Sequence, residues 1–176
     1  MIKTFGNSIQ RFDIAFILFV SKLNSRYVVD KIFYIISKIG DGPLYILIGV
    51  ALIFTPVEFS YHILLIGFLA FAIELPVYFI VKKYVKRLRP FEQMQNINHL
   101  IAPPDKYSFP SGHTSAAFVM ATLFSAFFNE VAFFLFLLAS LIGFSRIYLR
   151  VHYPTDIFAG AALGIISANL SIWILG

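Results

Sequence analysis

The sequence predicts an all-α fold: a polytopic membrane helical bundle of five to six transmembrane helices with an N-terminal amphipathic segment. Two observations predict it. The 176 residues are 59% hydrophobic and only 13% charged, whereas about a quarter of the residues in a water-soluble domain are charged. The apolar residues also gather into runs close to the ~20 residues that cross a bilayer. These features exclude a disordered chain and argue against a soluble globular domain.

The expected spans follow one another from residue 42. They are Gly42–Val57, Tyr61–Val81, Gly112–Phe128, Val131–Leu149 and Thr155–Leu175. The preceding stretch, Ile9–Ile39, is apolar but repeatedly interrupted by charge, as in helices that lie in the membrane interface. We expect one or two amphipathic helices there, with a sixth, poorer span as the alternative. The length favours a single domain that comprises residues 1–176, with the amphipathic segment at 1–41 and the membrane core at 42–176.

The net charge of +5 does not indicate a nucleic-acid-binding protein. Such proteins spread a basic stripe over a soluble surface, whereas these basic residues cluster beside apolar spans. That arrangement suits anionic headgroups or a phosphorylated substrate. The expected partners are therefore membrane lipids and a lipid phosphate, and no nucleic acid; the sequence does not indicate an oligomeric state. Because cysteine is absent, a disulfide scaffold, a thiolate metal site and a cysteine nucleophile are excluded.

Counting the spans brings two polar segments to the same membrane face. One is the long loop Lys82–Pro110, and the other is the junction Arg146–Asp156. Irregular backbone at membrane depth is tolerated where it lines a cavity, so this face is where a site is expected. This face carries three clusters of residues that can bind anions or take part in phosphoryl transfer. They are Lys82-x6-Arg89-Pro90, Pro110-Ser111-Gly112-His113 and Ser145-Arg146-x5-His152-x3-Asp156.

The first two clusters indicate anion binding. Lys82 and Arg89 are seven residues apart, so they point the same way on a continuing helix, and Pro90 biases Arg89 out of that helix. Ser111 and Gly112 stand where the next helix begins. The free N–H groups and positive dipole end at a helix start bind anions.

The third cluster adds a nucleophile. Asp156 can fix one nitrogen of His152 and leave the other free to attack phosphorus, with His113 as the general acid. Lys82, Arg89 and Arg146 would stabilise the phosphoryl oxygens. The carboxylates on this face, Glu92, Asp105 and Asp156, are isolated in the sequence. We therefore expect a reaction that needs no metal and no cofactor.

The three clusters resemble the signature of the type 2 phosphatidic acid phosphatase family, the membrane relatives of vanadium haloperoxidases. The pattern K-x6-RP, PSGH and SR-x5-H-x3-D is filled at every fixed position over roughly Tyr61–Leu175. The resemblance implies a helical-bundle lipid phosphatase in which His152 forms a phosphohistidine, Asp156 orients it and His113 protonates the leaving group. It implies phosphate binding by Lys82, Arg89, Ser111, Gly112 and Arg146. The small size resembles bacterial members that act on undecaprenyl pyrophosphate or phosphatidylglycerophosphate.

Other interpretations stay open at this point. A lipid-binding or transport protein would hold a phosphate without cleaving it, and a haloperoxidase-like site would hold vanadate. We expect Lys83, Lys86 and Arg87 to be interface cations that extend into water. Glu74 lies in the middle of a span, where an ionisable group is costly; pairing inside the bundle and contact with a headgroup are its two readings.

The orientation of the site is indicated by two arguments that disagree. The positive-inside rule places the Lys- and Arg-rich face in the cytoplasm. The resemblance implies the opposite side, and the cations of this face have a chemical reason to be there. We therefore expect a multi-pass cell-membrane protein with its active site on the extracytoplasmic face.

Overall fold

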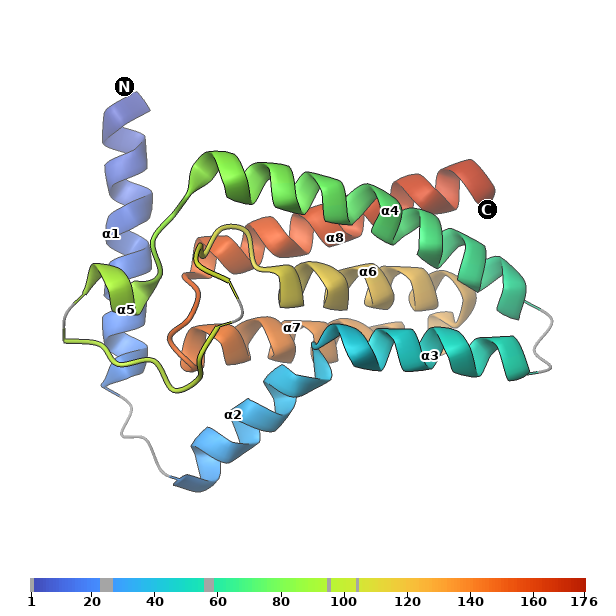
Figure 1. Ribbon diagram of the computed structural model, residues 1–176, viewed down its shortest axis with the longest axis horizontal. Coiled ribbons are helices and arrows are strands. Elements are labelled where there is room, and N and C mark those ends of the chain that lie inside the picture. The colour runs from blue at the N-terminus through green and yellow to red at the C-terminus, as the bar shows by residue number, and fades with distance from the viewer. Residues whose placement is uncertain (1, 23–26, 56–58, 95, 104) are drawn as a thin grey trace.

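The fold is all-α, as the sequence predicts. The computed structural model describes residues 2–22, 27–55, 59–94, 96–103 and 105–176. Within these residues every regular element is helical (Figure 1). The elements are α1 (Ile2–Ser21), α2 (Tyr27–Ile39), α3 (Gly42–Phe54), α4 (Ser60–Val85), α5 (Pro90–Gln93), α6 (Gly112–Phe127), the 3-10 turn η1 (Asn129–Val131), α7 (Ala132–Tyr148) and α8 (Pro154–Leu175).

The bundle is built around α6, which packs against α4, α7 and α8. Figure 1 shows these helices and α3 running along the long axis of the molecule. The α6–α8 contact is close because α8 presents glycines to the backbone of α6. A Cβ at Gly160 would lie 2.5 Å from the carbonyl oxygen of Ser111, and one at Gly164 would lie 2.3 Å from that of Ser115. Small residues at such contacts are typical of helices that pack within a membrane.

The distribution of side chains is that of a protein in lipid. Large apolar residues point outward from three different helices: Phe68 is 78% exposed, Phe133 71% and Trp173 82%. Small polar residues, in contrast, are buried between the helices, including Ser167 and Ser171 of α8. A soluble monomer does not expose apolar surface on this scale, so the outward faces suit contact with acyl chains.

The expected count of five to six spans is not confirmed. Three segments of the described residues are long and apolar enough to cross a membrane: Ser60–Gln93, Asn129–Tyr148 and Pro154–Leu175. The count rises to four if α2 and α3, which are bent by 48° at their junction, form one broken span. The helix α6 is only 16 residues long, about 24 Å, which is shorter than the ~30 Å hydrocarbon core. Residues 56 and 57, the end of the first expected span, lie outside the described residues.

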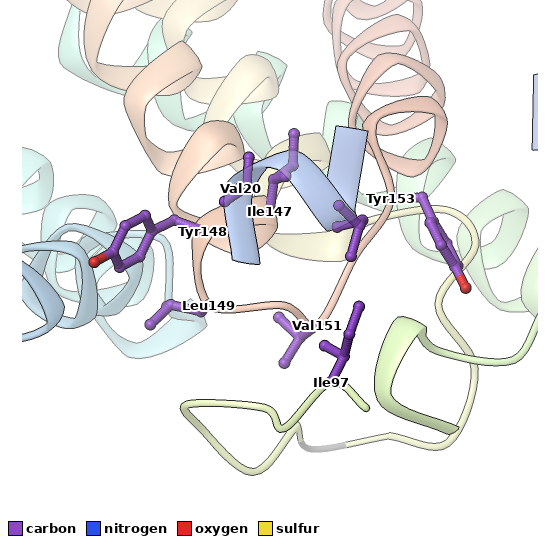
Figure 2. Close-up of a cluster of buried hydrophobic side chains, with 8 residues drawn as sticks. Val20, Ile97, Ile147, Tyr148, Leu149, Val151 and Tyr153 are labelled. Carbon is purple, nitrogen blue, oxygen red and sulfur yellow. The ribbon is translucent and has the colours of Figure 1, made fainter. Parts of the chain in front are cut away.

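The amphipathic N-terminal segment forms two helices, within the expected one or two. Figure 1 shows α1 crossing one end of the bundle, roughly perpendicular to the other long helices, and α1 is not among the segments apolar enough to span. Its inner face packs on the end of α7 and on the α7–α8 connection. Figure 2 shows Val20 of α1 close to Ile147 of α7, and Val151 of the connection beside Ile97.

The first prediction concerns the α6–α8 contact. Gly164→Ala should lower the melting temperature of the purified protein, because the new methyl group overlaps a backbone oxygen that cannot move freely. Overpacking of this kind costs about 1–3 kcal/mol. Gly49→Ala is the matched control, since its Cβ would meet only Leu64, at an ordinary 3.7 Å. Equal melting temperatures for the two variants would contradict the close packing.

Candidate functional site

The structure brings the three sequence clusters together at one end of the bundle. A cavity of about 980 Å³ lies there, where α4 and α7 end and where α6 and α8 begin (Figure 1). Six of the eight predicted site residues line it: Lys82, Arg89, Gly112, His113, Arg146 and His152. The other two, Ser111 and Asp156, are fully buried and are not part of its wall.

Lys82 and Arg89 converge by a different route from the one expected. They do not share one continuing helix, because α4 ends at Val85 and Lys86 adopts a left-handed conformation with φ of 49°. Arg89 is extended in front of Pro90, as the proline predicts. Its backbone N–H donates to Oε2 of Glu92 at 3.0 Å, which fixes the start of α5.

Asp105 holds the two cations together, and sequence reasoning missed it. Nζ of Lys82 donates to Oδ2 of Asp105 at 2.5 Å, and Nη2 of Arg89 donates to Oδ1. Although burial opposes the charge, these partners lower the pKa of Asp105 to about 2. An ionised carboxylate thus presents two oxygens to the cations that were expected to bind phosphate. No spacing pattern indicates this role of Asp105, because the contact depends on how the long loop folds back.

Ser111 and Gly112 stand at the start of α6, as predicted. The hydroxyl of Ser111 caps the helix and accepts a hydrogen bond from Oγ1 of Thr114 at 2.9 Å, while its backbone N–H donates to the carbonyl of Asp156 at 3.0 Å. Gly112 lies in the cavity wall, where a Cβ would come within 3.0 Å of the Tyr78 ring. The structure therefore gives Gly112 direct access to the cavity and turns the Ser111 side chain into the helix.

His113 has a carboxylate partner that the sequence did not reveal. Its Nε2 lies 2.7 Å from Oδ1 of Asp41, at the break between α2 and α3. Because a carboxylate only accepts, this contact places a proton on Nε2. Lys38 donates to the other oxygen of Asp41 at 2.8 Å. No local pattern links Asp41 to His113, which lies 72 residues further along the chain.

His152 is buried at the back of the cavity. Its Nδ1 lies 3.5 Å from Oδ2 of Asp156, and its Nε2 lies 3.4 Å from Nη1 of Arg89. Asp156 is fixed by the backbone N–H of Tyr153, which donates to Oδ2 at 2.8 Å. Burial, followed by the positive charges of Arg89 and Arg146, lowers the pKa of His152 well below its usual range. The imidazole is therefore neutral at physiological pH.

Arg146 and Glu74 complete the wall. Arg146 is 2% exposed, and its Nη1 donates to Oγ of Ser37 in α2 at 2.5 Å. Glu74 is also buried and lines the cavity beside the apolar side chains of Phe71 and Leu75. This position leaves both readings of Glu74 open.

The expectation that Arg87 is an interface cation is wrong. Lys83 and Lys86 are exposed, but Arg87 turns inward and binds two carboxylates. Its Nη1 donates to Oδ1 of Asp156 at 2.7 Å, and its Nη2 donates to Oδ2 of Asp13 at 2.5 Å. Sequence reasoning took Arg87 as a solvated cation, because it sits among other charged residues.

The arrangement can bind and attack a tetrahedral anion. Three cationic side chains and a neutral imidazole line one cavity, and the half-buried Gly112 at the start of α6 lies in the same wall. Charge-assisted hydrogen bonds of this kind are the strong ones. Among the residues that the structure describes, no three His, Cys, Asp or Glu side chains gather closely enough to hold a metal ion.

Comparison with known proteins identifies the family. Residues 59–176 match the model of the PAP2 superfamily, and the chain belongs to that superfamily, as the resemblance implied. The structure is similar to that of Aquifex aeolicus LpxE, with a TM-score of 0.80, 28% identity, and coverage of 92% of this chain and 94% of that one. It shares its fold with a transmembrane PAP2 type phosphatidylglycerolphosphate phosphatase from Bacillus subtilis, with a TM-score of 0.77, 23% identity, and coverage of 96% of this chain and 86% of that one.

Curated relatives match over shorter segments. A protein named bacitracin transport permease protein BcrC, from Bacillus licheniformis, is 40% identical over 85 residues, which are 48% of this chain and 42% of that protein. An undecaprenyl-diphosphatase from Sulfolobus acidocaldarius is 37% identical over 97 residues, 53% of this chain and 47% of that protein. The chain thus spans about half the length of these relatives.

The geometry of the cavity predicts a measurable affinity for inorganic phosphate. Added phosphate should raise the melting temperature of the protein in detergent. Arg146→Met should need about tenfold or more phosphate for the same rise in melting temperature, because a hydrogen bond to a charged group contributes about 1.5–3 kcal/mol. Lys83→Met, which removes an exposed cation, is the control. An Arg146→Met protein stabilised as strongly as wild type would contradict the predicted phosphate site.

Proposed function

We propose that this PAP2 superfamily protein is an integral membrane phosphatase that removes the terminal phosphate of a lipid phosphate or pyrophosphate. One observation carries the proposal. The neutral imidazole of His152 faces Lys82, Arg89 and Arg146 in a single cavity. A nucleophile and a cluster of cations are the two parts that phosphoryl transfer requires.

The first step transfers the phosphoryl group to the protein. Nδ1 of His152 faces Asp156, so Nε2 is the nitrogen that attacks phosphorus. An N–P bond forms while the bond from phosphorus to the leaving oxygen breaks, and His113 gives its proton to that oxygen. The three cations stabilise the charge on the remaining phosphoryl oxygens. For phosphate to reach Lys82 and Arg89, the carboxylate of Asp105 must give up its contacts with them.

The second step releases phosphate and restores the protein. His113, now neutral, accepts a proton from water as the water oxygen attacks the phosphohistidine. The N–P bond breaks, inorganic phosphate leaves, and His152 is again a neutral imidazole. The positive charge that the reaction needs is supplied by arginine and lysine side chains, so we propose that the reaction needs no metal and no cofactor.

The apolar part of the cavity supports a lipid substrate. Tyr45 and Ile46 of α3 line it together with Phe71 and Leu75 of α4, and such a wall suits an acyl or prenyl chain. The candidate substrates are undecaprenyl pyrophosphate, phosphatidylglycerophosphate and phosphatidate. The names of the relatives support this class without choosing between its members. We propose that 1–176 acts as one domain, because its N-terminal helices contribute Ser37 and Asp41 to the site.

A second candidate function is lipid-phosphate binding or transport without hydrolysis, and the name of the Bacillus licheniformis relative favours it. The pairing of His152 with Asp156 argues against this candidate, because mere binding needs cations and no oriented imidazole. A haloperoxidase-like vanadate site is disfavoured by the apolar outer surface. A panel of lipid phosphates, tested for phosphate release, separates hydrolysis from both.

We propose that the site faces the extracytoplasmic side of the cell membrane. A cysteine introduced within Asn96–Asn98, in the loop that covers the site, should react with a membrane-impermeant thiol reagent added to intact cells. Reaction only after the cells are opened would place the site in the cytoplasm, as the positive-inside rule suggests.

His152→Ala should abolish phosphate release from every lipid in the panel, because the nucleophile is lost. The variant should keep its melting temperature within a few degrees and still be stabilised by inorganic phosphate. His62→Ala is the matched control, since His62 lies at the far end of α4. Turnover by a folded His152→Ala protein would refute the assignment of the nucleophile.

The pH dependence of kcat should be bell-shaped. His152 must be neutral to attack, and its pKa is lowered by burial. Activity therefore falls only when the pH drops below that lowered value, and the acid limb should lie well below the usual pKa of a histidine, about 6.5. In the substrate complex the negative charge of the phosphate favours the protonated form of His113, so loss of that proton sets the alkaline limb of kcat. A chelator should leave turnover intact. A flat profile between about pH 5 and 9 would count against the two-histidine mechanism.

A further inference from the structure

Arg87 and Asp13 form a charged network behind the proposed nucleophile. Besides its contacts with Asp13 and Asp156, the guanidinium of Arg87 donates through Nη1 to Oγ1 of Thr155 at 2.7 Å. It also lies over the ring of Tyr153, 4.0 Å from the ring centroid. One side chain thus joins α1 to the first turn of α8, the helix that carries Asp156.

Asp13 is buried completely, although its helix lies across the end of the bundle, where water is within reach. A buried carboxylate is costly unless it is paired. Asp13 is paired fully: besides Arg87, it accepts from the backbone N–H of Thr155 at 3.1 Å and from its Oγ1 at 2.5 Å. Turning Asp13 outward would avoid the cost, so its burial calls for a specific role.

That role follows from the geometry at Asp156. Its Oδ1 accepts from Arg87, and its Oδ2 accepts from the backbone of Tyr153 and faces Nδ1 of His152. With both oxygens held, the carboxylate cannot rotate away from the imidazole. Without Arg87, Oδ1 would lose its ion pair, and the N–H of Tyr153 and the hydroxyl of Ser108 would be left to limit this rotation.

We infer that Arg87 and Asp13 are positioning residues for phosphoryl transfer: Asp13 fixes Arg87, and Arg87 fixes the carboxylate of Asp156 toward His152. The inference rests on the proposed function and extends it to two residues outside the family signature. The inference makes the N-terminal helix part of the catalytic apparatus, since α1 supplies Asp13, the first residue in this series of contacts.

The first test compares Arg87→Met with Lys83→Met, using the lipid phosphate that the wild-type protein hydrolyses fastest in the panel. Arg87→Met should lower kcat about tenfold to a hundredfold and change KM less than about threefold, because the phosphate-binding cations are untouched. Arg87→Lys should recover part of the loss, since lysine keeps the charge without the two-pronged geometry. Lys83→Met should behave as wild type.

The pH profile separates positioning from a merely structural role. The charged and titratable groups that face His152 are Arg89, Arg146, Lys82, His113 and Asp156. Arg87→Met leaves the charge of Asp156 uncompensated, so the acid limb of kcat/KM should move to higher pH. Asp13→Asn removes a negative charge that compensates Arg87, so the acid limb should move to lower pH. The substrate's own ionisation is the same for all variants and cancels in the comparison.

The double variant Asp13→Asn, Arg87→Met completes the test. Substitutions of two residues in one series of contacts should have non-additive effects on activity. The kcat of the double variant should therefore be no lower than that of Arg87→Met alone. A double variant whose loss of kcat equals the product of the two single losses would overturn the inference. Variants with lower melting temperatures but an unchanged kcat and an unchanged pH profile would overturn it as well. Wild-type protein that releases no phosphate would instead overturn the proposed function, and the inference with it.

Discussion

The structure depends on the pairing of charges at the end of an apolar bundle. Buried arginine, lysine and aspartate side chains meet where four helices begin or end, and charges removed from water are tolerated only when they are paired. Asp105 bridges Lys82 and Arg89, and Arg87 bridges Asp13 and Asp156. The two bridges differ in consequence, because the first occupies the groups that would bind substrate and the second holds the groups that would activate the nucleophile.

The packing of the helices fixes the positions of the site residues relative to one another. Gly160 and Gly164 draw α8 against α6, and the backbone N–H of Ser111 is bonded to the carbonyl of Asp156, so the starts of the two helices are fixed relative to each other. His113 and His152 are thereby carried by elements that cannot shift independently. Rigid placement of this kind is what catalysis by positioning requires.

Local sequence signals predicted the parts of the site that depend on local structure. Pro90 predicted that Arg89 leaves the helix, Ser111 and Gly112 marked the start of α6, and counting the spans placed the two polar segments on one face. Contacts between distant segments left no such signal. Asp41, Asp105 and Asp13 each look like an ordinary loop or surface charge, because their partners are set by tertiary packing. The expected span count is not confirmed, and α6 shows one reason: it packs against α4, α7 and α8, so its length need not match the bilayer.

The central claim is that His152 carries the phosphoryl group. The most direct measurement is to mix the protein with a labelled lipid phosphate, quench within milliseconds in alkali, and map the label by mass spectrometry. The account predicts an acid-labile, alkali-stable phosphoryl group on His152, formed and lost at rates consistent with turnover. Label on another residue, or steady turnover with no labelled protein at any time, would contradict it.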